Sequence, residues 1–421
     1  MDNHQRAPTM EFPHDFRCPI SMEPMKEPVT ISTGVTYERK NIEKWFLIYK
    51  KNTCPATMQP IDSFEITPNY TLKRLINSWK DGYSPSSSSC SSPTHHVQSN
   101  ELVSIMKTIE STPFKVTSLK KLKSILETGD EIMASEFKKL SGVEVLINIV
   151  EQVLVDSFDF IAFRACEEAL SVLHQLPFSS EDETICLLMK PECLKSMAIM
   201  LQRGSAEARL CTVSIFEKMG KADNNHWNLL IQDQGIDVFK SLLEIVSDEI
   251  SRKASSCALQ VLIQILKASK KSRLKAIEAG AVCTLIELVP DSTRSKCEKI
   301  MYLIKLMCEC ADGRLAFVEH GLGIAVVSKK LLNISIATTK IGVKILWLVC
   351  NFHPTEKVLE EMLFYGSMKK LVALLHIGGE DDSSTKERVV KILKLHANSW
   401  SRYPCFPREM KEYLGLGRDF C

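Results

Sequence analysis

Apolar residues recur at a helical period through most of the chain. Two clear examples are SSCALQVLIQILKAS at residues 255–269 and KIGVKILWLVCNF at residues 340–352. This spacing places the apolar side chains on one face of a helix. Few windows in this region alternate with a period of two, so we predict a mainly α-helical fold with few strands over residues 101–400.

Short glycine-containing boxes repeat within this helical region. The boxes read LSGVEVLINIV, DQGIDVFKSLL, EAGAVCTLIEL, EHGLGIAVVSK and FYGSMKKLVAL, and their glycines are Gly142, Gly235, Gly280, Gly321 and Gly366. Successive glycines from Gly235 onward are 45, 41 and 45 residues apart. The 93 residues between Gly142 and Gly235 leave room for one more box near MKPECLKSMAIML, where Pro191 supplies a helix-start signal.

Each box predicts a tight turn that feeds an amphipathic helix. A period of about 40–47 residues is typical of armadillo and HEAT arrays. The alternative is a helical bundle without repeats, in which glycines near helix ends coincide by chance. The region from about residue 100 to 400 resembles the armadillo repeat, and EAGAVCTLIELV at residues 278–289 is the best match. The resemblance implies an α-solenoid whose concave surface recruits a protein substrate.

The first 80 residues have a different pattern. Val29 to Tyr37 predicts a small hairpin with Gly34 at the left-handed turn position. A helix follows Glu38, with Ile42 and Trp45 on its apolar face, and YTLKRLINSWK predicts a second short helix. This module spans residues 12–80 and is separated from the helical region by a serine- and proline-rich segment, residues 81–100. That segment lacks apolar periodicity, so we predict a flexible linker. Residues 401–421 form a predicted C-terminal tail.

Composition indicates a soluble protein without a nucleic-acid surface. The 421 residues carry a net charge of +2, and the 15 cysteines occur without a C-x-x-C pair. Reduced thiols in a cytoplasmic protein, with a nuclear fraction as an alternative, are the simplest interpretation. The sequence shows no signal peptide and no apolar run long enough for a membrane span. It predicts no cofactor.

The N-terminal module has the outline of a zinc domain without its ligands. A zinc cross-brace needs eight Cys or His ligands, yet residues 16–79 contain only Cys18 and Cys54 and no histidine. We therefore predict no metal. A genuine zinc domain remains the alternative, and it predicts that chelators unfold residues 12–79.

The stretch FRCPISMEPMKEPVTISTGVTYERKNIEKWF, together with CPATMQPI, TPN and L-x-x-L-I-x-x-W, resembles the U-box, a small α+β relative of the RING finger that binds no zinc. In that family, charged and polar side chains replace the metal ligands. The resemblance implies a loop-pinning polar network made of Lys26, Glu27, Glu38, Arg39, Glu43 and Asn69. The alternative for each of these residues is a side chain that faces solvent.

The order of U-box, serine-rich linker and armadillo repeats is similar to plant U-box/armadillo ubiquitin ligases, particularly the stress- and immunity-linked branch. The resemblance implies a ligase that docks a ubiquitin-charged conjugating enzyme and has no catalytic nucleophile of its own. The implied docking residues are Ile20, Met22, Trp45 and Pro55. The alternative is that all four are core residues. Self-association through the U-box is a further expectation.

Met58 departs from the family pattern. Many relatives carry a basic residue at this position, the linchpin, which bonds both the conjugating enzyme and ubiquitin. A methionine side chain has no hydrogen to donate, so we expect slower ubiquitin discharge. Met58 also favours a rival interpretation, a non-catalytic armadillo adaptor with an inert U-box. A second rival, an import-receptor-like carrier, would need Trp and Asn at the repeat period, but Trp227, Trp347 and Trp400 do not recur at that period.

Overall fold

The computed structural model describes residues 13–81, 95–404 and 406, apart from short gaps at 113–114, 128–130, 156–159, 178–182, 223–226, 249–250 and 378–382. Most of the predicted linker and tail lie outside the described residues. The chain divides into two compact units. The first comprises residues 1–222 and 248–257, and the second comprises residues 223–247 and 258–421.

The N-terminal module, residues 13–81, is built on a three-stranded antiparallel sheet in the order β2-β1-β3. Its strands are β1 (Pro28–Thr30), β2 (Thr36–Glu38) and β3 (Thr67–Pro68). Val29 pairs with Tyr37 on one side and with Pro68 on the other. Gly34 turns the hairpin at a φ of 78°, which confirms the predicted hairpin. Strand β3 was not predicted from the sequence.

Short helices cover this sheet. They are η1 (His14–Phe16), α1 (Arg39–Glu43), the π-helical turn η2 (Lys44–Ile48) and α2 (Tyr70–Asp81). Both predicted helices are therefore present, although the first continues into a wider π turn. One apolar cluster forms the core, in which Tyr37, Ile42 and Ile76 are almost fully buried.

Helices make up the rest of the first unit. They are α3 (His95–Ser111), α4 (Val116–Leu126), α5 (Glu131–Lys139), α6 (Gly142–Val155), α7 (Phe160–Gln175), α8 (Glu183–Leu188), α9 (Pro191–Arg203) and α10 (Ala206–Ala222). Helix α7 packs against α4, α6 and α10. Pro191 occupies the first turn of α9, as predicted for the box that lacks glycine. Helix α3 begins at His95, inside the segment that the sequence assigned to the linker.

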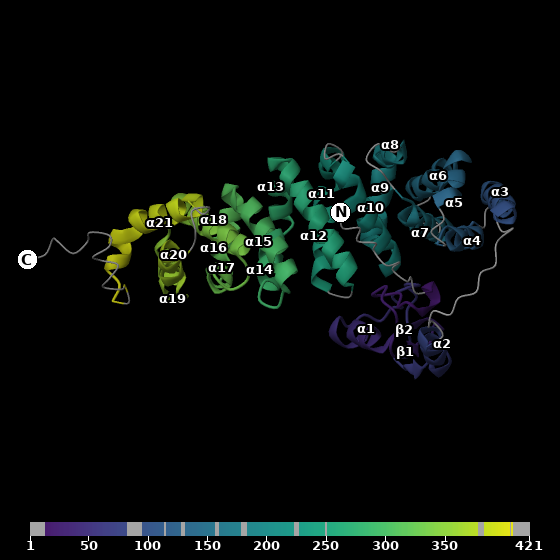
Figure 1. Ribbon diagram of the computed structural model, residues 1–421, viewed down its shortest axis with the longest axis horizontal. Coiled ribbons are helices and arrows are strands. Elements are labelled where there is room, and N and C mark those ends of the chain that lie inside the picture. The colour runs from purple at the N-terminus through teal and green to yellow at the C-terminus, as the bar shows by residue number, and fades with distance from the viewer. Residues whose placement is uncertain are drawn as a thin grey trace, which may run out of the picture. The chain divides into compact units, whose positions relative to one another are not determined.

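The second unit holds repeated helix triplets (Figure 1). The helices of these triplets are α13 (Lys270–Glu278), α14 (Ala281–Leu288), α15 (Arg294–Cys308), α16 (Ala311–Glu319), α17 (Gly323–Lys330), α18 (Ile336–Phe352), α19 (Glu356–Phe364), α20 (Ser367–His376) and α21 (Ser383–Ser401). The long third helix of each triplet stacks on the next, α15 on α18 and α18 on α21. This is the predicted array of helical repeats.

The glycine boxes differ in structure. Gly280 and Gly366 precede α14 and α20 at φ values of 85° and 71°, as a tight turn requires. At the first box the left-handed residue is Ser141, and α6 begins at Gly142. Gly321 lies just before α17 without a positive φ.

The predicted turn at Gly235 is wrong. This glycine lies inside α11 (Trp227–Asp248), a continuous helix that is followed by α12 (Arg252–Ala268). A Cβ at this position would lie 2.9 Å from Cδ of Lys275 and 3.2 Å from Cγ2 of Ile231. The glycine therefore allows a close approach between helices, a role that the box pattern does not distinguish from a turn.

The interior of both units is apolar, and the described cysteines are free thiols that are mostly buried. No described residues after α3 form a strand. None of the described helices has the length and apolar character needed to cross a membrane.

Candidate functional site

The N-terminal module presents two loops of the same design. CPISMEP at residues 18–24 and CPATMQP at residues 54–60 share the pattern C-P-x-[ST]-M-[EQ]-P. In the first loop the Met22 N–H donates to the Cys18 carbonyl at 2.8 Å, and in the second the Met58 N–H donates to the Cys54 carbonyl at 2.7 Å. Both methionines have a φ of 57°. This repeat was not predicted, although the equal spacing from C-P to M is visible in the sequence.

The first loop is held by the carboxylate of Glu38 at the end of β2. Its Oε2 accepts hydrogen bonds from the backbone N–H groups of Lys26 at 2.7 Å and Glu27 at 3.0 Å. The Glu38 N–H in turn donates to Sγ of Cys18 at 3.2 Å, and Nδ2 of Asn41 donates to the same sulfur at 3.5 Å. The Glu38 carboxylate and the Cys18 sulfur thus fix the two ends of the loop, because each accepts hydrogen bonds from a different segment of the chain.

The second loop is held by the phenol of Tyr37. Its oxygen lies 3.0 Å from Sγ of Cys54 and accepts the N–H of Ala56 at 3.1 Å. Burial, followed by the hydrogen bond with Cys54, raises the pKa of Tyr37 far above its ordinary value. Burial alone would raise the pKa of the Cys54 thiol, but hydrogen bonds from Thr33, Thr57 and Tyr37 hold it below its ordinary value. Trp45 adds a link from the helix, since Nε1 donates to the Thr53 carbonyl at 2.8 Å.

The remaining residues of the predicted network have smaller or different roles. Nη1 of Arg39 lies 3.4 Å from Oε1 of Glu43, and Nε of Arg39 lies 4.0 Å from Oε2 of Glu27. These ion pairs are partly exposed and contribute little to stability. Asn69 fixes the sheet: Nδ2 donates to the Thr30 and Thr36 hydroxyls, and Oδ1 accepts the N–H of Leu72 in α2.

Lys26 enters the network through its backbone N–H, which donates to Glu38. The two cysteine sulfurs and the side chains of Thr33, Tyr37 and Asn41 were not predicted as members of the network. Among the described residues, no group of three or more His, Cys, Asp or Glu side chains is arranged to hold a metal ion.

The predicted docking residues differ in exposure. Ile20 is only 2% exposed and belongs to the core cluster, and Pro55 is also buried. Met22 and Trp45 are half-buried. The exposure expected of docking residues is therefore absent at Ile20 and Pro55, because Ile20 packs into the module's own core. Leu47 and Ile48 were not predicted as docking residues, and they are exposed at 74% and 65% at the end of the helix.

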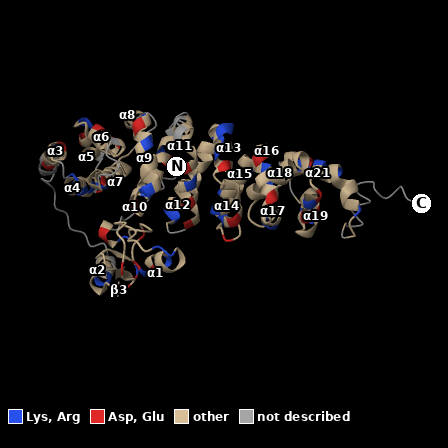
Figure 2. Cartoon of the chain, turned by 180° about the vertical axis from the view of Figure 1, so that it is seen from behind, with Lys and Arg blue, Asp and Glu red and all other residues tan. Residues whose placement is uncertain are grey.

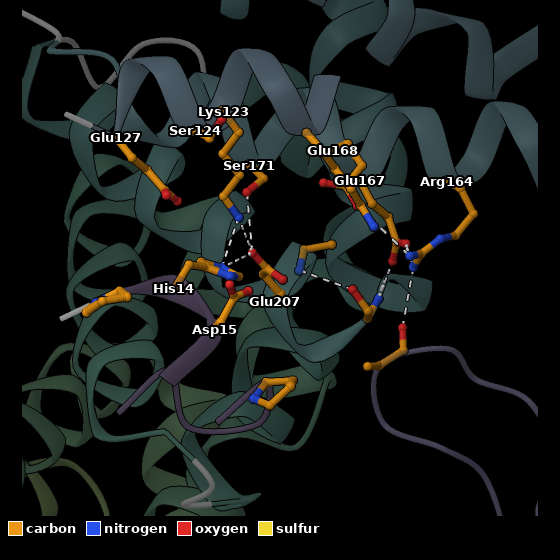
Figure 3. Close-up of a pocket in the computed structure, with 16 residues that line it drawn as sticks. His14, Asp15, Lys123, Ser124, Glu127, Arg164, Glu167, Glu168, Ser171 and Glu207 are labelled. Atoms are coloured by element: carbon orange, nitrogen blue, oxygen red, sulfur yellow. Dashed lines mark hydrogen bonds and ion pairs between the residues drawn. The ribbon is translucent and has the colours of Figure 1, made fainter. Parts of the chain in front are cut away.

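A polar pocket of about 520 Å³ lies in the first unit, where η1 and both loops face α4, α7 and α10 (Figure 3). Oε1 of Glu207 accepts a hydrogen bond from Nζ of Lys123 at 2.6 Å and lies 3.1 Å from Nε2 of His14. Burial would raise the pKa of Glu207, but the hydrogen bond with His14 and the charge of Lys123 reverse this effect. The pKa therefore lies well below its usual range.

Arg164 forms the other side of the pocket (Figure 3). Its Nη1 lies 2.5 Å from Oε2 of Glu167 and donates to the Ala56 carbonyl at 3.4 Å. Oε1 of Glu167 accepts the N–H of Ser205 at 2.6 Å. Ala56 and Ser205 are far in sequence from Arg164 and Glu167, so no local pattern predicted this pocket.

Two loops pinned by hydrogen bonds on a small sheet, followed by stacked helix triplets, define a U-box protein with armadillo repeats. Two family models match the chain. One, described as U-box domain, matches residues 12–84, and the other, described as plant U-box protein ARM repeat region, matches residues 98–413. The chain belongs to the plant U-box/armadillo family of ubiquitin-protein ligases, and its enzyme class is that of a U-box-type ubiquitin transferase.

The chain is similar along its length to two ligases of Arabidopsis thaliana. It is 35% identical to E3 ubiquitin-protein ligase PUB23, over 95% of this chain and 96% of that protein. It is 34% identical to E3 ubiquitin-protein ligase PUB22, over 95% of this chain and 98% of that protein. Among solved structures, an engineered protein from a structural genomics consortium matches with a TM-score of 0.51 and 14% identity, over 83% of this chain and 78% of that chain. This last likeness concerns the fold alone.

Proposed function

We propose that the two pinned loops and the helix between them dock a ubiquitin-charged conjugating enzyme. The observation that carries this proposal is the pair of equivalent loops, whose turns expose apolar side chains next to a rigid polar network. Met58 is 49% exposed, and Met22 and Trp45 are half-buried nearby in the same module. Apolar groups on a fixed scaffold are suited to anchor an interface, because little ordering entropy is lost on binding.

Transfer then goes directly from the conjugating enzyme to a substrate lysine. The ligase holds the thioester and the lysine close together, so catalysis rests on proximity and orientation. A covalent intermediate on this chain would need an accessible thiolate. Burial raises the pKa of Cys193 and of Cys350 to about 12, and Cys54, whose pKa is lowered, is fully buried. These three buried thiols are unsuited to that role, whereas Cys186 and Cys283 are exposed.

The armadillo repeats recruit the substrate in this proposal. A stacked array presents the same face of successive helices to a partner, which suits an extended protein segment. We propose a role in stress or immune responses, exercised in the cytoplasm, and this part of the proposal rests on the resemblance of the domain order to that branch of the family. Comparison of ubiquitinated proteins in elicitor-treated cells with and without the protein tests this role.

Self-ubiquitination tests the docking site. We expect product with at least one conjugating enzyme of a panel, and loss of most product in Met22→Asp, which places a charge in the turn without emptying the core. Tyr70→Asp is the matched control, because Tyr70 is 74% exposed on α2. Ile20→Ala is unsuitable, since it would also create a cavity.

Two outcomes would contradict the proposal. Unchanged product in Met22→Asp would place docking elsewhere. No product with any conjugating enzyme would favour the inert adaptor. Light scattering of the same preparations tests self-association through the U-box.

A further inference from the structure

The third helices of the second unit carry aromatic rings flanked by lysines. In α15, the Tyr302 ring has Nζ of Lys305 5.3 Å from its centroid and Nζ of Lys267, from α12, 5.2 Å away. In α18, Nζ of Lys344 lies 4.2 Å from the centroid of Trp347. Cations held over ring faces are attracted by the ring quadrupole, so these lysines are positioned rather than freely mobile.

Positive charge dominates these helices. Helix α18 contains no acidic residue, and Glu298 and Glu387 are the acidic residues of α15 and α21. Glu387 pairs with Lys391 at 2.7 Å, whereas Lys344 and Lys394 make no ion pair with a described residue. Figure 2 shows Lys and Arg in blue on the helices of this unit. The third helices thus hold an excess of positive charge in a chain whose net charge is only +2.

The charges are close enough to repel one another. Burial lowers the pKa of Lys344, and the neighbouring charges of Arg388 and Lys305 lower it further, while Glu309 opposes them. Glu309 also pairs with Arg273 at 2.6 Å and with Lys305 at 2.7 Å. Its charge is therefore shared among several cations. An anionic partner would relieve this repulsion.

A groove lies between α18 and α21. It has a volume of about 570 Å³ and is lined by Trp347, Asn351, Lys391, Lys394 and Leu395, among others. Asn351 and Leu395 are exposed, the latter at 57%. An amide such as that of Asn351 both donates and accepts, which suits the backbone of an extended peptide. The lysines suit its carboxylates, and the rings and Leu395 suit its apolar atoms.

We propose that the face formed by Lys267, Tyr302, Lys344, Trp347, Asn351 and Lys394 binds an extended acidic segment of a protein substrate. This inference rests on the proposed function, because it assigns a substrate class to the repeats. Packed helices lie about 8–10 Å apart, and an extended chain advances about 3.3 Å per residue. One carboxylate at about every third residue of the segment therefore meets the cations of successive helices.

Fluorescence anisotropy with the full chain tests the proposal. The probe is a labelled twelve-residue peptide with glutamate at every third position and glycine or serine between, compared with the same peptide carrying glutamine. We expect the glutamate peptide to bind at least tenfold more tightly than the glutamine peptide, with affinity that falls as salt rises. We expect Lys344→Glu and Trp347→Ala to weaken binding about tenfold, and Lys344→Arg to retain it.

Lys369→Glu is the matched control, because Lys369 is an exposed lysine of α20 outside the groove. Equal binding of the two peptides, or equal loss in Lys344→Glu and Lys369→Glu, would overturn the proposal. Tighter binding of a single-stranded RNA of similar length, lost in Lys344→Glu, would also overturn it by assigning the face to nucleic acid. Circular dichroism checks that Trp347→Ala is folded. Self-ubiquitination of each variant is measured in parallel. Absence of any ubiquitinated product would contradict the ligase function and leave the peptide-binding result intact.

Discussion

Glu38 shows how a single carboxylate does work that zinc does in related folds. It accepts two backbone N–H groups of the first loop, at 2.7 Å and 3.0 Å. We expect Glu38→Gln to destabilise the module by roughly 1–2 kcal/mol, because a neutral amide oxygen is a weaker acceptor for the two N–H groups than a carboxylate oxygen. Hydrogen exchange of the Lys26 and Glu27 amides measures the effect locally. Glu43→Gln, which alters only a partly exposed ion pair, should leave those amides unchanged, and equal acceleration in both variants would contradict this account.

Met58 is a residue-scale test of the docking proposal. Its side chain is exposed in the turn of the second loop and cannot donate a hydrogen bond. We expect Met58→Arg to accelerate ubiquitin discharge from the conjugating enzyme severalfold, because a guanidinium restores donors at the linchpin position. Met22→Arg occupies the equivalent turn of the first loop and should give no acceleration. Single-turnover discharge to free lysine measures both rates, and an unchanged rate in Met58→Arg would remove this position from the mechanism.

At the scale of the element, the glycines before the repeat helices allow the effect of backbone conformation to be compared with the effect of packing. A Cβ at Gly366 or at Gly321 would meet no atom within 4 Å, but only Gly366 has a left-handed φ, 71°. We expect Gly366→Ala to cost about 1–2 kcal/mol, and Gly321→Ala to be neutral or slightly stabilising because it restricts the unfolded chain. Denaturant unfolding of the two variants, followed by circular dichroism, compares them. Equal destabilisation of the two variants would contradict the assignment of this cost to φ.

The elements also show what the sequence can predict. The sequence pattern predicted helices α12 and α18 and the hairpin at Gly34. Each of these elements depends on contacts between residues that are near neighbours in the chain. The turn expected at Gly235 was wrong, since a glycine that permits close packing and one that permits a turn look alike in sequence. Glu38 was predicted as a network residue from family resemblance. The sulfur acceptors Cys18 and Cys54 were missed, because their partners are brought to them only by folding.

At the scale of the whole molecule, Glu207 joins segments that are distant in sequence within the first unit. Its folded-state pKa is depressed, so it stabilises the fold above the unfolded-state pKa of about 4.3, and this contribution is lost as the pH falls toward the folded-state value. We expect Glu207→Gln to cost roughly 3 kcal/mol at pH 7, because it leaves Lys123 without its carboxylate. The difference from wild type should shrink below about pH 4. Urea unfolding across pH measures it, and a constant difference would contradict the pairing.

The central claim is that hydrogen-bonded loops present a docking face for a ubiquitin-charged conjugating enzyme. Calorimetric titration of the full chain with a panel of ubiquitin-conjugating enzymes tests this claim most directly. We predict saturable binding to at least one enzyme, weakened at least tenfold in Met22→Asp and unchanged in Tyr70→Asp. No heat of binding with any member of the panel, or identical binding in both variants, would contradict it.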